Sequence, residues 1–69
     1  MSVKAPIAGV IITVLVQEGE KVEKGQPVLI LEAIKMEHEI VAPHDGTIQR
    51  ILVKNGQAVK AGEELVQLD

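Results

Sequence analysis

Few side chains in this sequence could act as a nucleophile or as an acid–base pair. The hydroxyl groups are those of Ser2, Thr13 and Thr47, and none of them lies in a recognised nucleophile motif. There is no cysteine, which excludes thiol chemistry and metal sites with cysteine ligands. The glycines are spaced as in turns and form no phosphate-binding loop. The sequence therefore predicts a protein without a catalytic site of its own.

The two histidines offer the only pattern that could hold a metal ion or transfer protons. His38 lies between Glu37 and Glu39. Side chains alternate along a strand, however, which places His38 on the opposite face from both carboxylates. His44 is followed by Asp45-Gly46, a composition typical of a turn. We expect solvated strand and loop residues at both histidine positions, and no metal site.

Lys35 is the remaining candidate, because it lies between two apolar runs. Residues 28–31 precede it and residues 40–41 follow, a pattern that predicts a β-hairpin with Lys35 near its tip. Tight hairpin turns favour Asn-Gly or Asp-Gly, since their central residues need a positive φ. Here Ile34 and Lys35 occupy the turn, and Ile34 and Met36 place apolar side chains at an exposed tip. A break in local turn chemistry of this kind is typical of functional sites.

The elements that must position this hairpin come from an internal repeat. Residues 5–32 align without a gap with residues 42–69, at an offset of 37 positions and with 10 identities in 28. The identities include three glycines and the Ala-Pro that begins each copy. The pattern predicts two copies of one supersecondary unit. Residues 33–41, which contain the Lys35 hairpin, join the two copies.

Each copy is predicted to form short strands, because its apolar runs are brief, β-branched and bounded by glycine or proline. The expected strands are residues 10–16, 27–31, 48–53 and 64–68, with shorter pieces around Val22 and Val59. Two such units bury their apolar faces against each other. We therefore predict an all-β, two-sheet sandwich or flattened barrel with pseudo-two-fold symmetry, as a single domain over residues 1–69. Lys35 should project from one end, with the termini at the other.

Composition limits the partners of this domain. A chain of 69 residues, 46% of them hydrophobic and none aromatic, is expected to build one small core of Val, Ile, Leu and Ala. The net charge of −3 and the missing aromatic rings disfavour nucleic-acid binding. No apolar run is long enough to span a membrane, and the first residues do not form a signal peptide. We expect a cytoplasmic protein, or a mitochondrial one if these residues come from a longer eukaryotic precursor.

The hairpin also resembles a known motif. Biotinyl domains carry the biotin-attachment motif Glu-Ala-Met-Lys-Met-Glu, and the corresponding residues here are Glu32-Ala33-Ile34-Lys35-Met36-Glu37. The similarity extends over nearly the whole chain, through residues 3–9, 19–25, 46–53 and 56–62. Ile34 departs from the motif, and a β-branched residue with positive φ costs about 1–2 kcal/mol, so we expect a strained tip. Because the two copies align without a gap, the chain resembles the members that lack a protruding thumb insertion.

The resemblance implies a biotin carboxyl carrier domain, which is not an enzyme, with two four-stranded antiparallel sheets. A biotin protein ligase would join biotin to the ε-amine of Lys35. The residues that would support ligase recognition or shape the hairpin are Glu32, Ala33, Ile34, Met36 and Glu37. The biotin would receive a carboxyl group at a biotin carboxylase and deliver it at a carboxyltransferase to an acyl-CoA or a 2-oxo acid such as pyruvate, or serve a decarboxylase. The isolated domain is expected to be monomeric.

Three other functions stay open as alternatives. A lipoyl domain shares the fold and the hairpin lysine, but its usual Asp-Lys-Ala motif differs from Ile34 and Met36 on both sides of the lysine. An unmodified structural or interaction module, like the lipoyl-like hairpins of export adaptors, would not need the lysine motif. A stand-alone enzyme would need a nucleophile and an acid–base pair that this sequence does not provide.

Overall fold

The chain folds into eight short strands, and the computed structural model describes all residues from 1 to 69. In chain order the strands are β1 (Ser2–Lys4), β2 (Gly9–Val14), β3 (Lys21–Val22), β4 (Pro27–Ala33), β5 (Met36–Val41), β6 (Gly46–Ile51), β7 (Ala58–Val59) and β8 (Glu64–Leu68). No helix in the structure is long and apolar enough to cross a bilayer.

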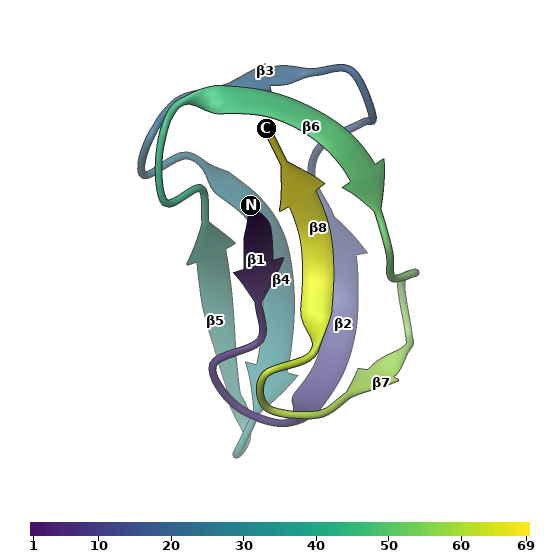
Figure 1. The fold of residues 1–69 in the computed structure, drawn as a ribbon. Helices are drawn as coiled ribbons and strands as arrows, with labels where there is room; N and C mark the ends of the chain where they lie inside the picture. Colours follow the sequence, from purple (N-terminus) through teal and green to yellow (C-terminus); the bar gives the residue numbers. More distant parts are fainter.

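The strands form two four-stranded antiparallel sheets, which confirms the predicted fold class (Figure 1). One sheet has the order β5-β4-β2-β7 and is called the hairpin sheet below, because β4 and β5 form the Lys35 hairpin. The other has the order β1-β8-β6-β3 and is called the terminal sheet. The offset of 37 residues carries β2 onto β6, β3 onto β7 and β4 onto β8. The two sheets are therefore pseudo-symmetric copies of one arrangement.

Backbone hydrogen bonds interlock the two halves of the chain in pairs that obey the same offset. The Gly25 N–H donates to the Ala42 carbonyl at 2.8 Å, and the Gly62 N–H donates to the Ala5 carbonyl at 2.8 Å. Each repeat thus supplies a partner for the turn of the other. Because each of these hydrogen bonds joins one repeat to the other, the two repeats build one body.

Two of the predicted strands begin and end earlier in the structure than in the sequence analysis. β2 is Gly9–Val14 and not 10–16, and β6 is Gly46–Ile51 and not 48–53, so both end two residues before the expected position. Both strands have shifted register, between Ile11 and Thr13 and between Ile48 and Arg50. Such irregularities bend a strand. Beyond them the chain leaves the ladder, and Val16 and Val53 are buried in the core.

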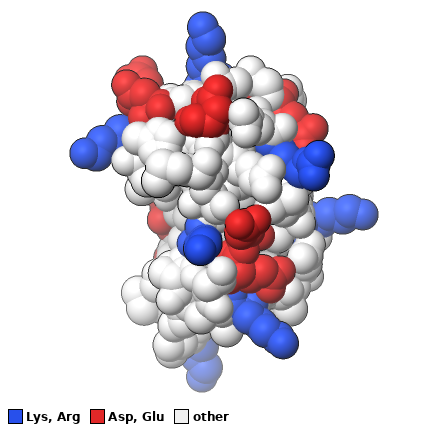
Figure 2. All heavy atoms as spheres, viewed as in Figure 1, with Lys and Arg blue, Asp and Glu red and all other residues white.

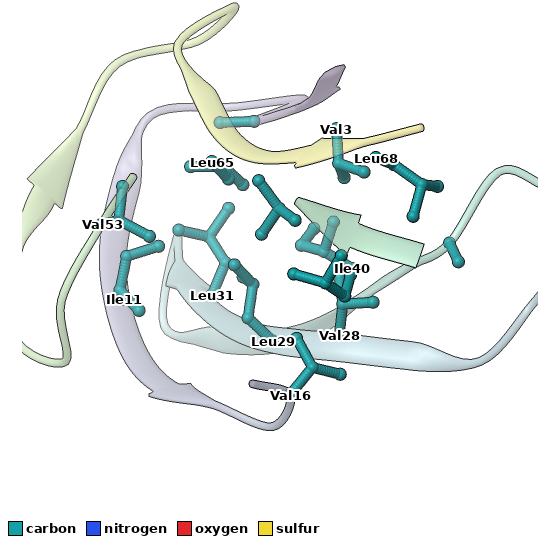
Figure 3. Packing of buried hydrophobic residues seen from close by; sticks show 14 of the residues in the cluster. Val3, Ile11, Val16, Val28, Leu29, Leu31, Ile40, Val53, Leu65 and Leu68 are labelled. Carbon is teal, nitrogen blue, oxygen red and sulfur yellow. The ribbon is translucent and has the colours of Figure 1, made fainter. Parts of the chain in front are cut away.

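The core between the sheets is entirely apolar. Sixteen buried residues form one cluster, and no polar or charged residue is buried. In Figure 3, Leu65 and Leu68 of β8 face Leu29 and Leu31 of β4 across the interior. All four of these leucines are fully buried, and each buried side chain of this size contributes roughly 1.5–3 kcal/mol. The core therefore clamps β4, the strand that leads to the Lys35 turn.

The two ends of the chain lie side by side in the terminal sheet. The Met1 ammonium group donates a hydrogen bond to the Leu68 carbonyl at 2.7 Å, and the Leu68 N–H donates to the Met1 carbonyl at 2.7 Å. The molecule is elongated, with extents of 30 × 19 × 18 Å. The turn between β4 and β5 protrudes at one end of the long axis, away from the two termini (Figure 1).

Candidate functional site

The Lys35 site is a two-residue turn at the end of a regular antiparallel pair. Strands β4 and β5 pair residue by residue from Leu29 and Ile40 up to Ala33 and Met36, which leaves Ile34 and Lys35 as the only residues of the turn. β4 is a central strand of the hairpin sheet, held by β2 on one side and β5 on the other. A short turn on a clamped strand gives the lysine a well-defined position at the tip.

The backbone of the turn is left-handed at both of its residues. Ile34 has φ 52° and Lys35 has φ 62°, and they are the only residues other than glycine with a positive φ. Two-residue hairpin turns with positive φ at both central positions match the twist of the flanking strands, which explains the geometry. The left-handed conformation expected for Ile34 is confirmed. The left-handed conformation costs about 1–2 kcal/mol for an L-residue, and asparagine and glycine tolerate it more readily.

The side chains of the tip are open to solvent. Ile34 is 80% exposed and Met36 is 63% exposed, so neither gains stability from burial. Lys35 is exposed as well, and its amine makes no hydrogen bond or ion pair. Ala33, by contrast, is 4% exposed and belongs to the interior. Of the residues predicted for recognition, Ala33 can therefore anchor the turn but cannot touch a partner.

Two carboxylates stand next to the turn. Glu32 and Glu37 are directly opposite each other across the β4–β5 pair, and both are exposed. Like charges in this position destabilise a sheet by a few tenths of a kcal/mol up to about 1 kcal/mol. Glu39, which was not among the predicted site residues, lies on the same face two residues further along β5. Because side chains alternate along a strand, Glu39 points to the same side as Glu37, and this pattern would have added Glu39 to the predicted site residues.

The histidines do not form a metal site. No group of three or more potential ligands comes together in the structure. His38 was expected to be a solvated strand residue but is half-buried, because it pairs with Leu31, which is fully buried. His44 differs from the solvated loop residue that was expected, because it is half-buried and its Nε2 atom is buried without a partner. Its Nδ1 atom lies 2.7 Å from the Asp45 carbonyl oxygen.

We predict that Ile34→Asn stabilises the domain. Asparagine tolerates positive φ, and the isoleucine side chain contributes almost no burial that could be lost. The free energy of unfolding should rise by about 1 kcal/mol, which raises the melting temperature by roughly 4–8 °C in a domain of this size. Thermal unfolding followed by circular dichroism would measure the change. Ile12→Asn is the matched control, because Ile12 is also exposed but has no positive φ. An equal gain in the free energy of unfolding in both variants would contradict the explanation from backbone strain at Ile34.

Comparison with known proteins gives consistent results. A family model described as "biotin-requiring enzyme" matches residues 1–68. The biotin carboxyl carrier protein of acetyl-CoA carboxylase from Solanum lycopersicum is 58% identical over 45 residues, which are 65% of this chain and 64% of that protein. The biotin carboxyl carrier protein of Streptococcus mutans is 48% identical over 64 residues, which are 93% of this chain and 49% of that protein.

The fold has similar counterparts among solved structures. A single-chain, multi-domain long-chain acyl-CoA carboxylase contains a region with a TM-score of 0.91 and 35% sequence identity. The match covers 96% of this chain and 7% of that protein. This chain thus spans less than two thirds of the length of each of the proteins described here.

Proposed function

We propose that the chain, which belongs to the family of biotin-requiring enzymes, is a biotin carboxyl carrier domain with Lys35 as the attachment residue. The observation that carries the proposal is the geometry of the tip. The lysine amine has no partner within the protein, and a strained two-residue turn holds it at one end of the molecule. Such a domain is a carrier and not an enzyme.

The residues at the tip fit a covalently attached biotin. Lys35 supplies the only amine on the turn, and its neighbours Ile34 and Met36 offer exposed apolar surface beside the attachment point. In the attachment reaction the ε-amine attacks the activated carboxyl carbon of biotin, loses a proton and releases the activating group, which leaves an amide. When bound, biotin supplies a ring nitrogen that can carry a carboxyl group.

The role of the protein in this chemistry is to hold the attachment residue in position. The apolar core holds β4, so the attachment residue stays at the end of the folded domain while its own side chain is exposed to solvent. A tether at either terminus would leave the tip clear (Figure 1). Tethering of this kind makes each encounter with a neighbouring active site intramolecular and raises the effective concentration, typically to the millimolar range.

The proposed partners follow from the relatives, which are parts of biotin-dependent carboxylases. A biotin protein ligase would modify Lys35, a biotin carboxylase would load the carboxyl group and a carboxyltransferase would unload it. The names of the relatives favour an acyl-CoA as the acceptor.

Intact mass spectrometry would test the proposal directly. After incubation with a biotin protein ligase, biotin and ATP, we expect a mass increase of one biotinyl group. Amide formation removes the positive charge of one lysine, so the net charge should change from −3 to about −4, visible as a shift in ion-exchange elution. No increase with this ligase, together with modification by a lipoate ligase, would make the chain a lipoyl carrier instead.

A further inference from the structure

One hollow opens on the surface of the domain, between the edge strands of the two sheets. Strand β1 is the edge of the terminal sheet, and β5 is the edge of the hairpin sheet. The hollow has a volume of about 300 Å³, and it is the only pocket of the domain. The residues that line it are Ser2, Val3, Lys4, Pro6, Glu39, Ile40, Val41 and Pro43. A volume of this size is at the lower limit for a small-molecule site.

The residues of the hollow are pairs related by the internal repeat. The offset of 37 residues carries Ser2 onto Glu39, Val3 onto Ile40, Lys4 onto Val41 and Pro6 onto Pro43. The hollow therefore lies on the pseudo-two-fold axis of the domain. Two of the pairs are apolar in both copies. The other two pairs break the symmetry, and they supply the only charged residues of the hollow, Lys4 and Glu39.

Both charged residues lie at the end of the hollow that is closer to the Lys35 turn. Strands β1 and β5 run in opposite directions, and β1 runs toward the turn (Figure 1). Lys4 follows Val3 in β1, and the matching position in β5 has Glu39 before Ile40, so both lie on the turn side of the axis. Both side chains are exposed, and neither makes a hydrogen bond or an ion pair within the protein. The hollow thus offers a free hydrogen-bond donor and a free acceptor at one end.

The base of the hollow is apolar. Val3 and Ile40 are 6% and 9% exposed, and both belong to the core cluster. Pro6 and Pro43 are exposed at its two ends, and neither has a backbone N–H that a ligand would have to satisfy. A ligand in the hollow would therefore contact apolar surface below and a polar pair at the rim.

The charges on this side of the molecule do not form a patch of one sign. Figure 2 shows the side over β1 and β8, where positive and negative side chains are interspersed. The summed field of such a surface is weak, so it does not favour a strongly charged ligand. Lys4 and Glu39 instead suit an uncharged ligand that both accepts and donates hydrogen bonds.

We propose that the hollow is a resting site for the ring system of the biotin on Lys35, an inference that rests on the proposed carrier function. The ureido ring of biotin carries a carbonyl oxygen flanked by N–H groups. A lysine ammonium group only donates hydrogen bonds, and a carboxylate only accepts them. Lys4 would donate to the ureido oxygen, and Glu39 would accept from a ureido N–H. The sulfur-containing ring would then lie against the apolar base of the hollow.

The length of the attachment allows this contact. Glu39 is four residues beyond Lys35 in the chain, a distance of about 13 Å along a strand. The lysine side chain and the acyl chain of biotin together supply about eleven bonds, which span roughly 14 Å when extended. The ring system at the end of this arm therefore reaches the near end of the hollow, where the donor and the acceptor lie.

Weak binding is sufficient for such a site. A group tethered to the same domain has an effective concentration in the millimolar range. A dissociation constant of about 1 mM for the untethered ring would then leave the site about half occupied. Such a site withdraws the ring from solvent between encounters and still releases it readily to a neighbouring active site.

NMR spectra of the apo and the biotinylated domain would test the proposal. We expect biotinylation to shift the backbone amide signals of residues 2–4 and 39–41 in addition to those of the turn. Nuclear Overhauser contacts should appear between the ring protons of biotin and the methyl groups of Val3 and Ile40. Both effects should be unchanged on dilution, because the contact is intramolecular.

A double variant, Lys4→Met with Glu39→Met, removes the donor and the acceptor but keeps side chains of similar length. Lys54→Met with Glu23→Met is the matched control, because both residues are exposed and neither lines the hollow. The first variant should lose the Overhauser contacts and the shifts at residues 2–4 and 39–41, and the control should keep them. Melting temperatures would verify that both fold. Should the first variant unfold, Glu39→Met alone replaces it.

The rate at which streptavidin captures the attached biotin gives a second measurement. Only biotin outside the hollow is accessible, so a half-occupied site lowers the association rate about 2-fold. The Lys4→Met with Glu39→Met variant should therefore associate about 2-fold faster than the wild type, and the control at the wild-type rate.

Three results would overturn the resting site. The first is a set of shifts confined to residues 33–37 without contacts to the base of the hollow, and the second is an equal loss in the double variant and its control. The third is a shift of residues 2–4 and 39–41 in the apo protein as its concentration rises, which would assign the hollow to a second copy of the chain. Failure of the wild-type domain to accept biotin would instead overturn the carrier function itself, and the intact mass reports it before any spectrum is recorded.

Discussion

Replacing Lys35 with arginine is expected to abolish biotin incorporation and to leave the fold intact. A guanidinium group stays protonated and cannot form the amide, so no acceptor remains on the turn. The substitution keeps the charge, the long aliphatic stem and the exposed position of the side chain. The free energy of unfolding should therefore change by less than about 0.5 kcal/mol. Intact mass after incubation with ligase, and a thermal unfolding curve, would measure both effects.

The matched control is Lys60→Arg, since Lys60 is exposed at the end of β7 but lies outside any two-residue hairpin turn. It should accept one biotinyl group at the wild-type rate. Incorporation into the Lys35→Arg protein would show that another lysine is the attachment site. A lowered melting temperature would show that the Lys35 side chain has a structural role that its exposure does not indicate.

Replacing Gly9 with alanine should have the largest effect on stability. A Cβ atom at Gly9 would overlap the backbone carbonyl oxygen of Glu32 and lie 3.1 Å from a methyl group of Leu31. Neither neighbour can move easily, because β4 is paired on both sides and Leu31 is fully buried. Overpacking against fixed atoms costs roughly 1–3 kcal/mol or more, so we expect a fall in melting temperature of about 10 °C or more, measured by thermal or urea unfolding.

Gly46 is the internal control for this prediction, because it occupies the position of Gly9 in the second repeat. A Cβ atom there would lie 2.8 Å from the backbone oxygen of Asp69, and 3.2 Å from both a side-chain oxygen of Asp69 and the Cγ atom of Leu68, so no contact is as close as the overlap at Gly9. Asp69 lies after β8 and outside the strand, whereas Glu32 lies within β4, which is paired on both sides, so Asp69 can shift more easily. Gly46→Ala should therefore lower the free energy of unfolding by less than Gly9→Ala does. Equal losses of stability would contradict the explanation that the Gly9 site is tight because β4 cannot move.

The effect at Gly9 also connects stability with the functional site. Glu32 precedes Ala33 and the turn, so a displaced Glu32 backbone would move the base of the hairpin. For this reason the sheet behind the tip matters to Lys35 even though it makes no contact with the lysine amine.

Local features of the sequence were sufficient to predict the two-sheet fold and the position of the turn. The repeated glycines and Ala-Pro pairs mark most of the observed strands, although β1 (Ser2–Lys4) was not predicted and β2 and β6 end earlier than expected. The absence of turn residues around Lys35 indicated that Ile34 would be forced to a positive φ, as the structure shows. These features were predictable because turn geometry and side-chain alternation depend on neighbouring residues in the chain.

Features that depend on the packing of distant segments were not predicted. The ends of β2 and β6, the burial of Ala33 and the half-buried His44 depend on where the chain passes from one sheet to the other. The steric limit at Gly9 exists only because β4 runs beside β2. No sequence pattern within a few residues indicates contacts between such distant segments.

The sequence alone therefore determined that two similar β units are joined by a hairpin with a lysine at its tip, because strand periods and turn chemistry are local. Only the tertiary structure decided which faces those units bury and which they leave outward. Pairing of β2, β4 and β5 in the hairpin sheet places Val10, Ile12, Ile30 and Val41 on one face, the side opposite the core. It also places Lys35 at one end of that sheet, since β4 and β5 carry the turn.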